Sequence, residues 1–570
     1  MAEMSRYPVL NFSGGIRRDK SSFELQVNEL LDARNVEVDE RGRVKSRRGS
    51  QQFGQTLSGE LENGYFIKPA TGAVLTSHFL VSTNASTSLI YKLVQRGRLS
   101  ADITTASTTI SVASTTDFDA SGTIEIDGDQ IDYTGVTATS FTGVTGISVA
   151  HSTGAPVHQW DLLTQSGTAL DGRSGLSYGV LNGIVFIVGR AANMKQYALS
   201  TSTISDVSAE PSSILLENYR DRLYTAGDGT SGGTNSSVIR TSFCNRGDGT
   251  TWTTAQDFFD SEDQNGEAIT AYKVLNDRLG IFKTNSIFVY DEIENKQRVT
   301  GVGAYNQKVI QRMGDNLVTF CPKGIFVTNL FSAKQIGEPV RELWKDFVPT
   351  YDAFERTCTN TFAWTFQDRY FLFLEARSGS NDTVLEYNFT TDAWTAHNDG
   401  YSGLLNALSL NTFRFGDGDS IAREAVFTLS SSSIARRLYE NVYATGETPP
   451  SVIGGDIFVD LRSNTSQPIS SYVETALYDL AQPNLWKTVK NLRVYSEVGQ
   501  WTVEYRVEDE SGRVSAYRPL GTTRGTNYVF ALPSECAGYR IGLRLSATSF
   551  VSSSILNGFV FEKITLSERH

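Results

Sequence analysis

Histidine is scarce in this chain, and the residue patterns of common catalytic and metal sites are missing with it. The 570 residues include five histidines, and no two of them form an HxH or HxxxH pair. That spacing gives no basis for a compact histidine metal site. Neither a Walker A sequence nor a complete GxGxxG fingerprint occurs. The sequence therefore predicts no catalytic residue, no metal and no cofactor, and we expect the protein not to be an enzyme.

Cysteines are also few, and long apolar runs are missing. The four cysteines are scattered along the chain without a CxxC pair (Cys244, Cys321, Cys358, Cys536). Such a pattern predicts reduced, buried thiols, as suits assembly in a reducing cytoplasm. No apolar run approaches the ~18 residues that a transmembrane helix needs. Residues 1–20 hold no apolar core of signal-peptide length. We expect a chain with no membrane span that folds in the cytoplasm.

Basic residues are outnumbered by acidic ones. The formal net charge is −12 and the isoelectric point is about 5.1. Domains that grip nucleic acid by neutralising phosphates are usually basic. The charge is therefore evidence against tight DNA binding, although it allows DNA to pass close by.

The residues that are abundant favour strands and tight turns. Apolar residues make up 39% of the chain and aromatic residues 11%, and 49 residues are glycine. This composition supplies material for folded cores and excludes disorder over the whole chain. Because 570 residues exceed what one core usually serves, we expect two to four structural units in an all-β protein.

A hairpin pattern recurs along the chain. A polar two-residue turn is followed by about five strand residues, another turn, and a strand that often ends in an aromatic residue. The intervals between these turns are irregular, at roughly 40 to 55 residues, which is typical of β-propeller blades. The predicted turn pairs are Asn182-Gly183, Asp221-Arg222, Asp277-Arg278, Asp315-Asn316 and Asp368-Arg369.

Changes in residue composition and in the length of the predicted strands divide the chain into five segments. Residues 98–157 are almost purely alternating and rich in Ser and Thr, which predicts a small β domain inserted at a blade loop. Strands lengthen after about residue 450, which predicts a C-terminal β-sandwich. The predicted segments are 1–63, an extended arm with one hairpin; 64–97, the first propeller blade; 98–157, the insertion; 158–450, the remaining blades; and 451–570, the sandwich.

Several short motifs are better explained by structure than by chemistry. Gly175-Leu176-Ser177-Tyr178-Gly179 matches the GxSxG nucleophile elbow, but a strand follows it where the elbow needs a helix. Asp127-Gly128-Asp129 and Asp417-Gly418-Asp419 do not complete a calcium-binding loop, so we interpret both as turns. His151 and His158 are expected to lie on the surface.

A basic cluster ends the hairpin of the arm, at Arg43, Lys45, Arg47 and Arg48. Two interpretations stay open for it. It forms either a solvated face or a contact with an acidic partner subunit or DNA. We take these four residues as candidates for an assembly contact.

The arm also carries a family resemblance. It holds Ser13-Gly14-Gly15 and then an "A-x-N-V…G…R-x-G" stretch, with Ala33, Asn35, Val36, Gly42, Arg47 or Arg48, and Gly49. Together with residues 215–350, this stretch resembles the tail hub or nozzle family of tailed bacteriophages, also called tail tubular protein B or phage stabilisation protein. No single motif is diagnostic, but their order is hard to obtain by chance.

The resemblance implies a structural virion protein that forms a homohexameric ring in the viral tail. Such a ring would lie below the portal and its adaptor, contact other tail proteins (fibre or needle), and be assembled in the host bacterial cytoplasm. Genomic double-stranded DNA would pass through the lumen without specific binding, so that the ring conducts it and helps retain it during packaging and ejection. Two alternatives stay open. One is a propeller that binds or cleaves glycans, and the other is a fibre-like adhesin.

Overall fold

Strands make up nearly all of the regular structure in this computed structural model. The structure describes residues 2–47, 49–52, 54–67, 78–116, 118–126, 129–173, 175–190, 193–198, 203–207, 213–227, 238–253, 256–262, 266–351, 358–375, 382–398, 404–413, 422–430, 435–443, 459–462, 465–549 and 554–568. Within these ranges the helical elements are short: η1 (Gln307–Val309), η2 (Glu338–Val340) and α1 (Arg341–Trp344). The prediction of an all-β chain is confirmed.

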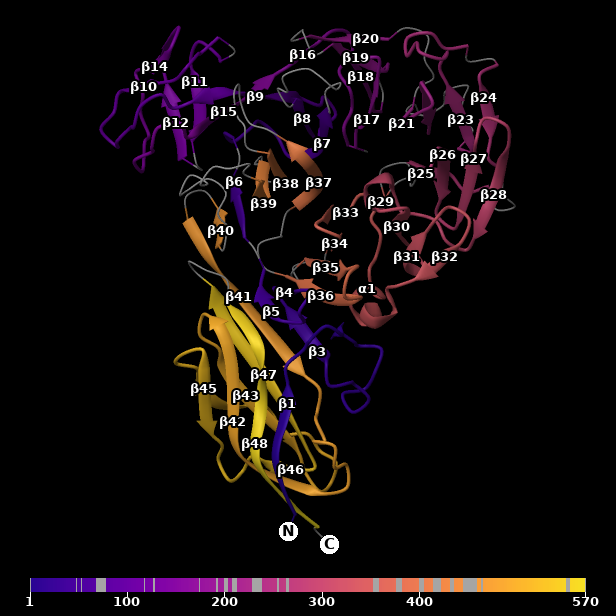
Figure 1. Ribbon diagram of the computed structural model, residues 1–570. Coiled ribbons are helices and arrows are strands. Elements are labelled where there is room, and N and C mark those ends of the chain that lie inside the picture. Colours follow the sequence, from indigo (N-terminus) through magenta and orange to yellow (C-terminus); the bar gives the residue numbers. More distant parts are fainter. Residues whose placement is uncertain are drawn as a thin grey trace.

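The upper part of the molecule in Figure 1 consists of antiparallel sheets that follow one another along the chain. Three of them are separate four-stranded sheets. The first holds β21 (Leu215–Tyr219), β22 (Arg222–Ala226), β23 (Arg240–Phe243) and β24 (Phe258–Asp260). The second holds β25 (Ile269–Leu275), β26 (Arg278–Lys283), β27 (Ser286–Tyr290) and β28 (Asn295–Thr300). The third holds β29 (Gln311–Met313), β30 (Asn316–Cys321), β31 (Gly324–Thr328) and β32 (Ala333–Gln335).

Four more strand groups of this kind complete the upper part. One holds β17 (Ser177–Leu181), β18 (Ile184–Val188), β19 (Lys195–Ala198) and β20 (Thr203–Asp206), with β16 (Thr164–Gln165) beside β20. Another holds β33 (Thr361–Phe366), β34 (Arg369–Leu374), β35 (Thr383–Asn388) and β36 (Ala393–His397). A third holds β37 (Leu404–Phe413), β38 (Ala422–Ser430) and β39 (Ala435–Tyr443), completed by β6 (Ser50–Gln52) of the arm. The fourth holds β7 (Leu61–Ile67), β8 (His78–Thr83), β9 (Ile90–Arg98) and β15 (Pro156–Leu162).

Four of the five turns predicted for these hairpins share a backbone conformation. Both central residues have positive φ, at 52° and 77° for Asn182 and Gly183 and at 45° and 57° for Arg220 and Asp221. This is the geometry of type I′ turns, whose twist matches that of the flanking strands. Four predicted turn pairs are wrong by one residue, because the residue that follows each Asp already belongs to the next strand. The observed pairs are Arg220-Asp221, Asn276-Asp277, Gly314-Asp315 and Gln367-Asp368.

The first strands of successive sheets lie next to each other. β17 contacts β21, β21 contacts β25, β29 contacts β33, β33 contacts β37, and β37 contacts β7. The helical turn η1 joins β25 to β33. Between β7 and β17, the rings of Tyr65 and Tyr178 stack with centroids 5.2 Å apart. The series of contacts therefore returns to the strand at which it began.

Residues 99–155 form an insertion between β9 and β15. These two strands pair with each other, and Pro156 lies opposite Arg98. They form β10 (Thr109–Ser111), β13 (Gly135–Thr137) and β14 (Ser140–Thr142), which make a small sheet, and the hairpin of β11 (Gly122–Ile126) and β12 (Asp129–Tyr133). Their buried side chains gather in a cluster of their own, around Ile110, Ile124 and Phe141. This segment thus has its own core next to the sheet of β7–β9.

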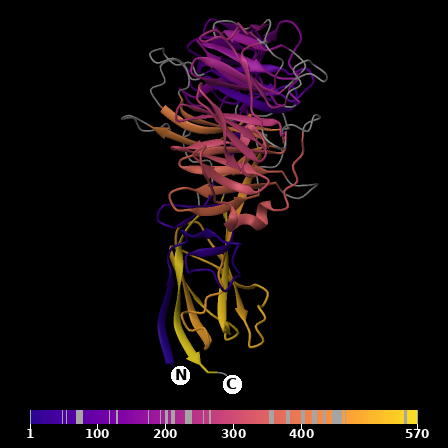
Figure 2. The ribbon, with the colours of Figure 1, turned by 90° about the vertical axis from the view of Figure 1, so that its right-hand side faces the viewer.

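Two sheets of longer strands build the lower part (Figure 2). Buried side chains of both, such as Trp501 and Phe559, share one cluster. One sheet holds β1 (Ala2–Val9), β48 (Ile555–Ser567), β42 (Trp486–Val498), β45 (Asn527–Ala531) and β46 (Ala537–Gly538). The other holds β41 (Thr465–Thr475), β47 (Arg540–Ser549), β43 (Thr502–Glu508), β44 (Arg518–Thr522) and, next to β41, β40 (Val459–Arg462).

The arm runs through both parts of the molecule. Its first strand, β1, extends the lower sheet by pairing with β48. Next come β2 (Gly15–Ile16) and β3 (Glu29–Arg34), and β3 lies between β36 above and β41 below. The expected hairpin forms from β4 (Val36–Val38) and β5 (Val44–Ser46). Residues 28–37 are therefore mostly strand, with strands of both parts beside them.

Candidate functional sites: the arm joint and the axial cavity

Three arm residues of the family resemblance, Gly15, Asn35 and Arg47, lie where the upper and lower parts join, in what we call the arm joint. At its centre Asn35 has φ 54°, and its backbone N–H donates to Ala396 O at 2.8 Å. Its side-chain Nδ2 donates to Ser470 O at 2.8 Å and to Asn398 Oδ1 at 3.0 Å, while Oδ1 accepts from Arg47 Nε at 3.2 Å. One side chain thus connects the arm, the sheet of β33–β36 and strand β41.

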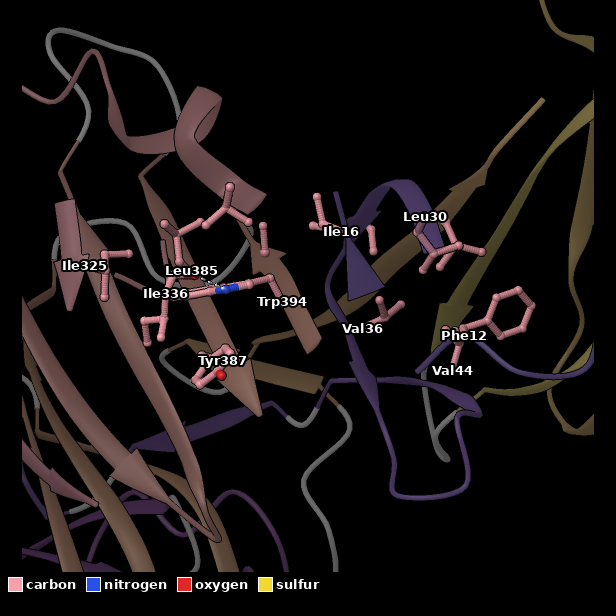
Figure 3. Packing of buried hydrophobic residues seen from close by; sticks show 14 of the residues in the cluster. Phe12, Ile16, Leu30, Val36, Val44, Ile325, Ile336, Leu385, Tyr387 and Trp394 are labelled. Atoms are coloured by element: carbon pink, nitrogen blue, oxygen red, sulfur yellow. Dashed lines mark hydrogen bonds between the residues drawn. The ribbon is translucent and has the colours of Figure 1, made fainter. Parts of the chain in front are cut away.

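Apolar packing surrounds this joint. Ile16 and Val36 of the arm lie between Trp394 on one side and Leu30 on the other (Figure 3). The indole Nε1 of Trp394 donates to Ile336 O at 3.0 Å. Gly15 has φ 57°, and a Cβ there would lie 2.6 Å from the backbone nitrogen of Trp394, so glycine is required for this close approach. The Gly-Gly segment and the Trp therefore serve one interface within the chain.

The four assembly candidates fall into different environments. Arg47 is fully buried, at 0% exposure, which corrects the expectation for that residue, because a side chain inside its own subunit is not free to contact a partner. Arg43 forms ion pairs within the chain, with Asp39 Oδ2 at 2.7 Å and Glu497 Oε1 at 2.6 Å, and these raise its pKa. Lys45 is half-buried in β5, and Arg48 lies outside the described residues.

A buried ion network connects the arm to the sheet of β33–β36. The Nη1 of Arg369 lies 2.9 Å from Glu37 Oε2 on β4 and 2.7 Å from Glu386 Oε1 on β35. His397 Nε2 lies 2.7 Å from the other oxygen of Glu386. Burial favours the neutral form of Glu386, but Arg369 and His397 outweigh it and hold the pKa of this carboxyl below its ordinary value. The network therefore stabilises a carboxylate deep inside the protein.

A cavity of about 520 Å³ lies where the first strands of the upper sheets meet, and we call it the axial cavity. Its lining comes from six first strands (β7, β17, β21, β25, β29 and β33) and the residues just before them, together with η1. Lys308 Nζ forms an ion pair with Glu62 Oε1 at 3.0 Å. Burial raises the pKa of the Glu217 carboxyl, and the charge of Lys273 partly opposes that rise. The polar lining residues include Glu62, Asn63, Glu217, Asn218, Lys273, Gln307, Lys308, Gln311 and Arg312.

The GxSxG sequence forms part of this lining, but Ser177 is not placed as a nucleophile. Its Oγ donates to Leu216 O at 3.1 Å and accepts from Leu216 N at 3.0 Å. The hydroxyl is buried, and both of these hydrogen bonds join it to the backbone of β21. These bonds support the structural interpretation of the motif, in which Ser177 fastens β17 to β21.

His151 of the inserted segment and His158 of β15 are buried, so the expectation that they lie on the surface was wrong. His151 Nε2 lies 3.2 Å from Asp129 Oδ2, and His158 Nδ1 lies 2.9 Å from Glu125 Oε2. Their carboxylate partners offset the cost of burying the polar rings, a combination that the local sequence does not show. Both pairs lie close to where the inserted segment adjoins the upper sheets.

Other sequence expectations have mixed outcomes. All four cysteines are buried, as expected. Of the two acidic turns, Asp129 accepts hydrogen bonds from Ser148, while residues 127–128 and 417–419 lie outside the described residues. A search of the described part of the chain finds no cluster of three or more His, Cys, Asp or Glu suited to a metal ion. The same part contains no helix long and apolar enough to cross a membrane.

Comparison with known proteins gives weak likenesses. No family model and no curated protein matches the chain. Among solved structures it is similar to the computationally designed Ika8 protein, with 10% identity and a TM-score of 0.35 over 69% of this chain and 99% of that one. It is also similar to BamB from Moraxella catarrhalis, with 8% identity and a TM-score of 0.32 over 70% of this chain and 98% of BamB. Likenesses at this level say nothing about what the chain does.

Proposed function

We propose that this chain is a structural subunit of the DNA-conducting tail of a tailed bacteriophage, of the hub or nozzle type, and that it is not an enzyme. The observation that carries the proposal is the arm joint. The residues on which the family resemblance rests, Gly15, Asn35 and Arg47 among them, connect the two parts of the molecule. These residues hold the two parts of the subunit together, which is a structural role and suits a protein that bears mechanical load in a tail.

As part of this proposal, the upper part is a seven-bladed β-propeller and the lower part a β-sandwich. The blades begin with β7, β17, β21, β25, β29, β33 and β37, whose neighbour contacts return to β7. The last blade takes its fourth strand, β6, from the arm. Such borrowing from the other end of the chain closes a ring without leaving free sheet edges. The inserted domain then belongs to the first blade.

The assembly that we propose is a homohexameric ring in the virion tail, built in the host cytoplasm. It would contact the portal-proximal adaptor on one side and fibre or needle proteins on the other. The net charge of −12 supports a lumen that lets genomic DNA slide past, because phosphates meet few compensating cations overall.

Electron microscopy of the purified chain, alone and mixed with portal-proximal adaptor protein, tests this function. We expect rings with sixfold symmetry, at least when the adaptor is present. Trimeric particles would favour the fibre-like adhesin. Monomers that never join the adaptor complex would overturn the proposal.

The glycan-binding or glycan-cleaving alternative has one observation in its favour, which is the axial cavity with two carboxylates, Glu62 and Glu217, in its lining. Glycoside hydrolysis needs a carboxyl pair of which one member acts as an acid. Hydrolysis of a glycan by the purified chain, abolished by Glu217→Gln, would favour this alternative over the structural role.

A further inference from the structure

Two polar atoms in residues that line the axial cavity lack a hydrogen-bond partner among the described residues. Within the described part of the chain, Glu62 Oε2 and Gln307 Oε1 are buried atoms that accept no hydrogen bond. Glu62 as a residue is 5% exposed, and its other oxygen is held by Lys308. A buried acceptor without a donor is unfavourable, and more so if it is charged. Two such atoms in one cavity are therefore a reason to expect a molecule that brings donors.

The charges of the lining restrict what that molecule can be. Three cationic side chains, Lys273, Lys308 and Arg312, face two carboxylates, Glu62 and Glu217. Because the cations are in excess, an ammonium ligand would meet net repulsion. An anion without hydroxyl groups, such as sulfate or acetate, brings acceptors and no donors, so it would leave Glu62 Oε2 and Gln307 Oε1 unsatisfied. A neutral ligand with several hydroxyl groups meets both conditions, because each hydroxyl can donate and accept.

The remaining lining fits the same class of ligand. Asn63, Asn218 and Gln311 supply amides, and Tyr65, Leu176 and Ile214 supply apolar surface. A volume of about 520 Å³ falls in the usual range of small-molecule sites, about 300–1,000 Å³. Glu62 and Gln307 are held by other elements, since Lys308 pairs with Glu62 and Gln307 Nε2 donates weakly to Leu216 O at 3.4 Å. The acceptors are therefore positioned before a ligand arrives.

We propose that the axial cavity is a binding site for a neutral saccharide, with hydroxyl groups donating to Glu62 Oε2 and Gln307 Oε1. The proposal concerns binding alone and assigns no reaction to the site. It goes beyond the proposed tail function and does not depend on it, because the cavity lies within one subunit.

Titration calorimetry with the full-length chain tests the site. The neutral probes are glucose, galactose, N-acetylglucosamine and the disaccharides maltose and lactose, and the charged probe is the cationic glucosamine. We expect saturable binding of at least one neutral sugar, weaker or no binding of glucosamine, and a loss of about tenfold in affinity in Gln307→Ala. Gln297→Ala, on exposed strand β28, is the matched control and should bind as the unchanged protein does.

A second variant, Glu62→Gln, removes the buried negative charge and should reduce affinity further. If it fails to fold because Lys308 loses its partner, Gln307→Ala still decides the question. The proposal is overturned if no neutral sugar binds saturably, if Gln307→Ala binds as well as Gln297→Ala, or if glucosamine binds more tightly than glucose. Ring formation is measured separately by microscopy, so a failure here leaves the tail proposal standing.

Discussion

Replacing Arg369 with Met should detach the arm from the sheet of β33–β36. Arg369 makes two short ion pairs, with Glu37 and Glu386, and its loss would leave Glu37 buried without this cation and Glu386 with His397 alone. Hydrogen bonds to charged groups contribute about 1.5–3 kcal/mol each, and breaking a buried pair on one side costs about 3–5 kcal/mol. We therefore expect a loss of about 3–5 kcal/mol in the free energy of unfolding of the upper part at pH 7.

The pH dependence of the same network has a definite sign. Because the pKa of Glu386 is lower in the folded than in the unfolded protein, its contribution is fully present above the unfolded pKa of about 4.3. It is lost as pH falls through the lower, folded value. Wild-type stability should thus fall steeply below about pH 4, and Glu386→Gln should flatten that part of the curve.

Urea unfolding followed by tryptophan fluorescence measures both effects, since Trp364 and Trp394 lie in this group of strands. Hydrogen exchange of β4 and β36 would locate the change. The matched control is Arg341→Met, whose ion pair with Glu338 is exposed and worth little. A cost below about 1 kcal/mol for Arg369→Met, or an equal cost for the control, would refute the reasoning.

Three further predictions follow from the joint, the insertion and the charge. Gly15→Ala should destabilise the protein by more than about 2 kcal/mol in urea unfolding, because its Cβ would meet the backbone of Trp394. Gly183→Ala also has positive φ but nothing within 4 Å, so it should cost only about 1 kcal/mol, and equal costs would contradict the packing argument. Replacing residues 99–155 by a short Gly/Ser bridge should leave a soluble protein with nearly unchanged unfolding of the rest, because this segment has its own core; insoluble protein would show that the first sheet needs it. Assembled rings should bind duplex DNA weakly in fluorescence anisotropy between 50 and 200 mM salt, where a protein with six to ten phosphate contacts loses roughly 10³–10⁵ in affinity; micromolar binding with a steep salt slope would disprove the sliding channel.

Much of the local structure was predictable from the sequence. Alternating apolar residues, Asn and Asp at turns, and the scarcity of helix-forming stretches indicate an all-β chain of short hairpins, because strand periodicity and turn chemistry are local properties. The turn positions were off by one residue at Asp221, Asp277, Asp315 and Asp368 for a local reason too. Asp is suited to either central position of a tight turn, so the Asp alone does not show on which side of it the other turn residue lies.

The environments of charged residues were decided by the tertiary structure. Arg47 looked like part of a basic surface cluster, but packing of the arm against strands more than 300 residues away buries it beside Asn35. Likewise, Glu62 and Gln307 are about 245 residues apart in the sequence and share a cavity only because the upper sheets are arranged around it. The sequence by itself determined strands, turns and the absence of common catalytic motifs. Burial and the pairing of distant charges depend on which strands become neighbours, and only the tertiary structure decides that.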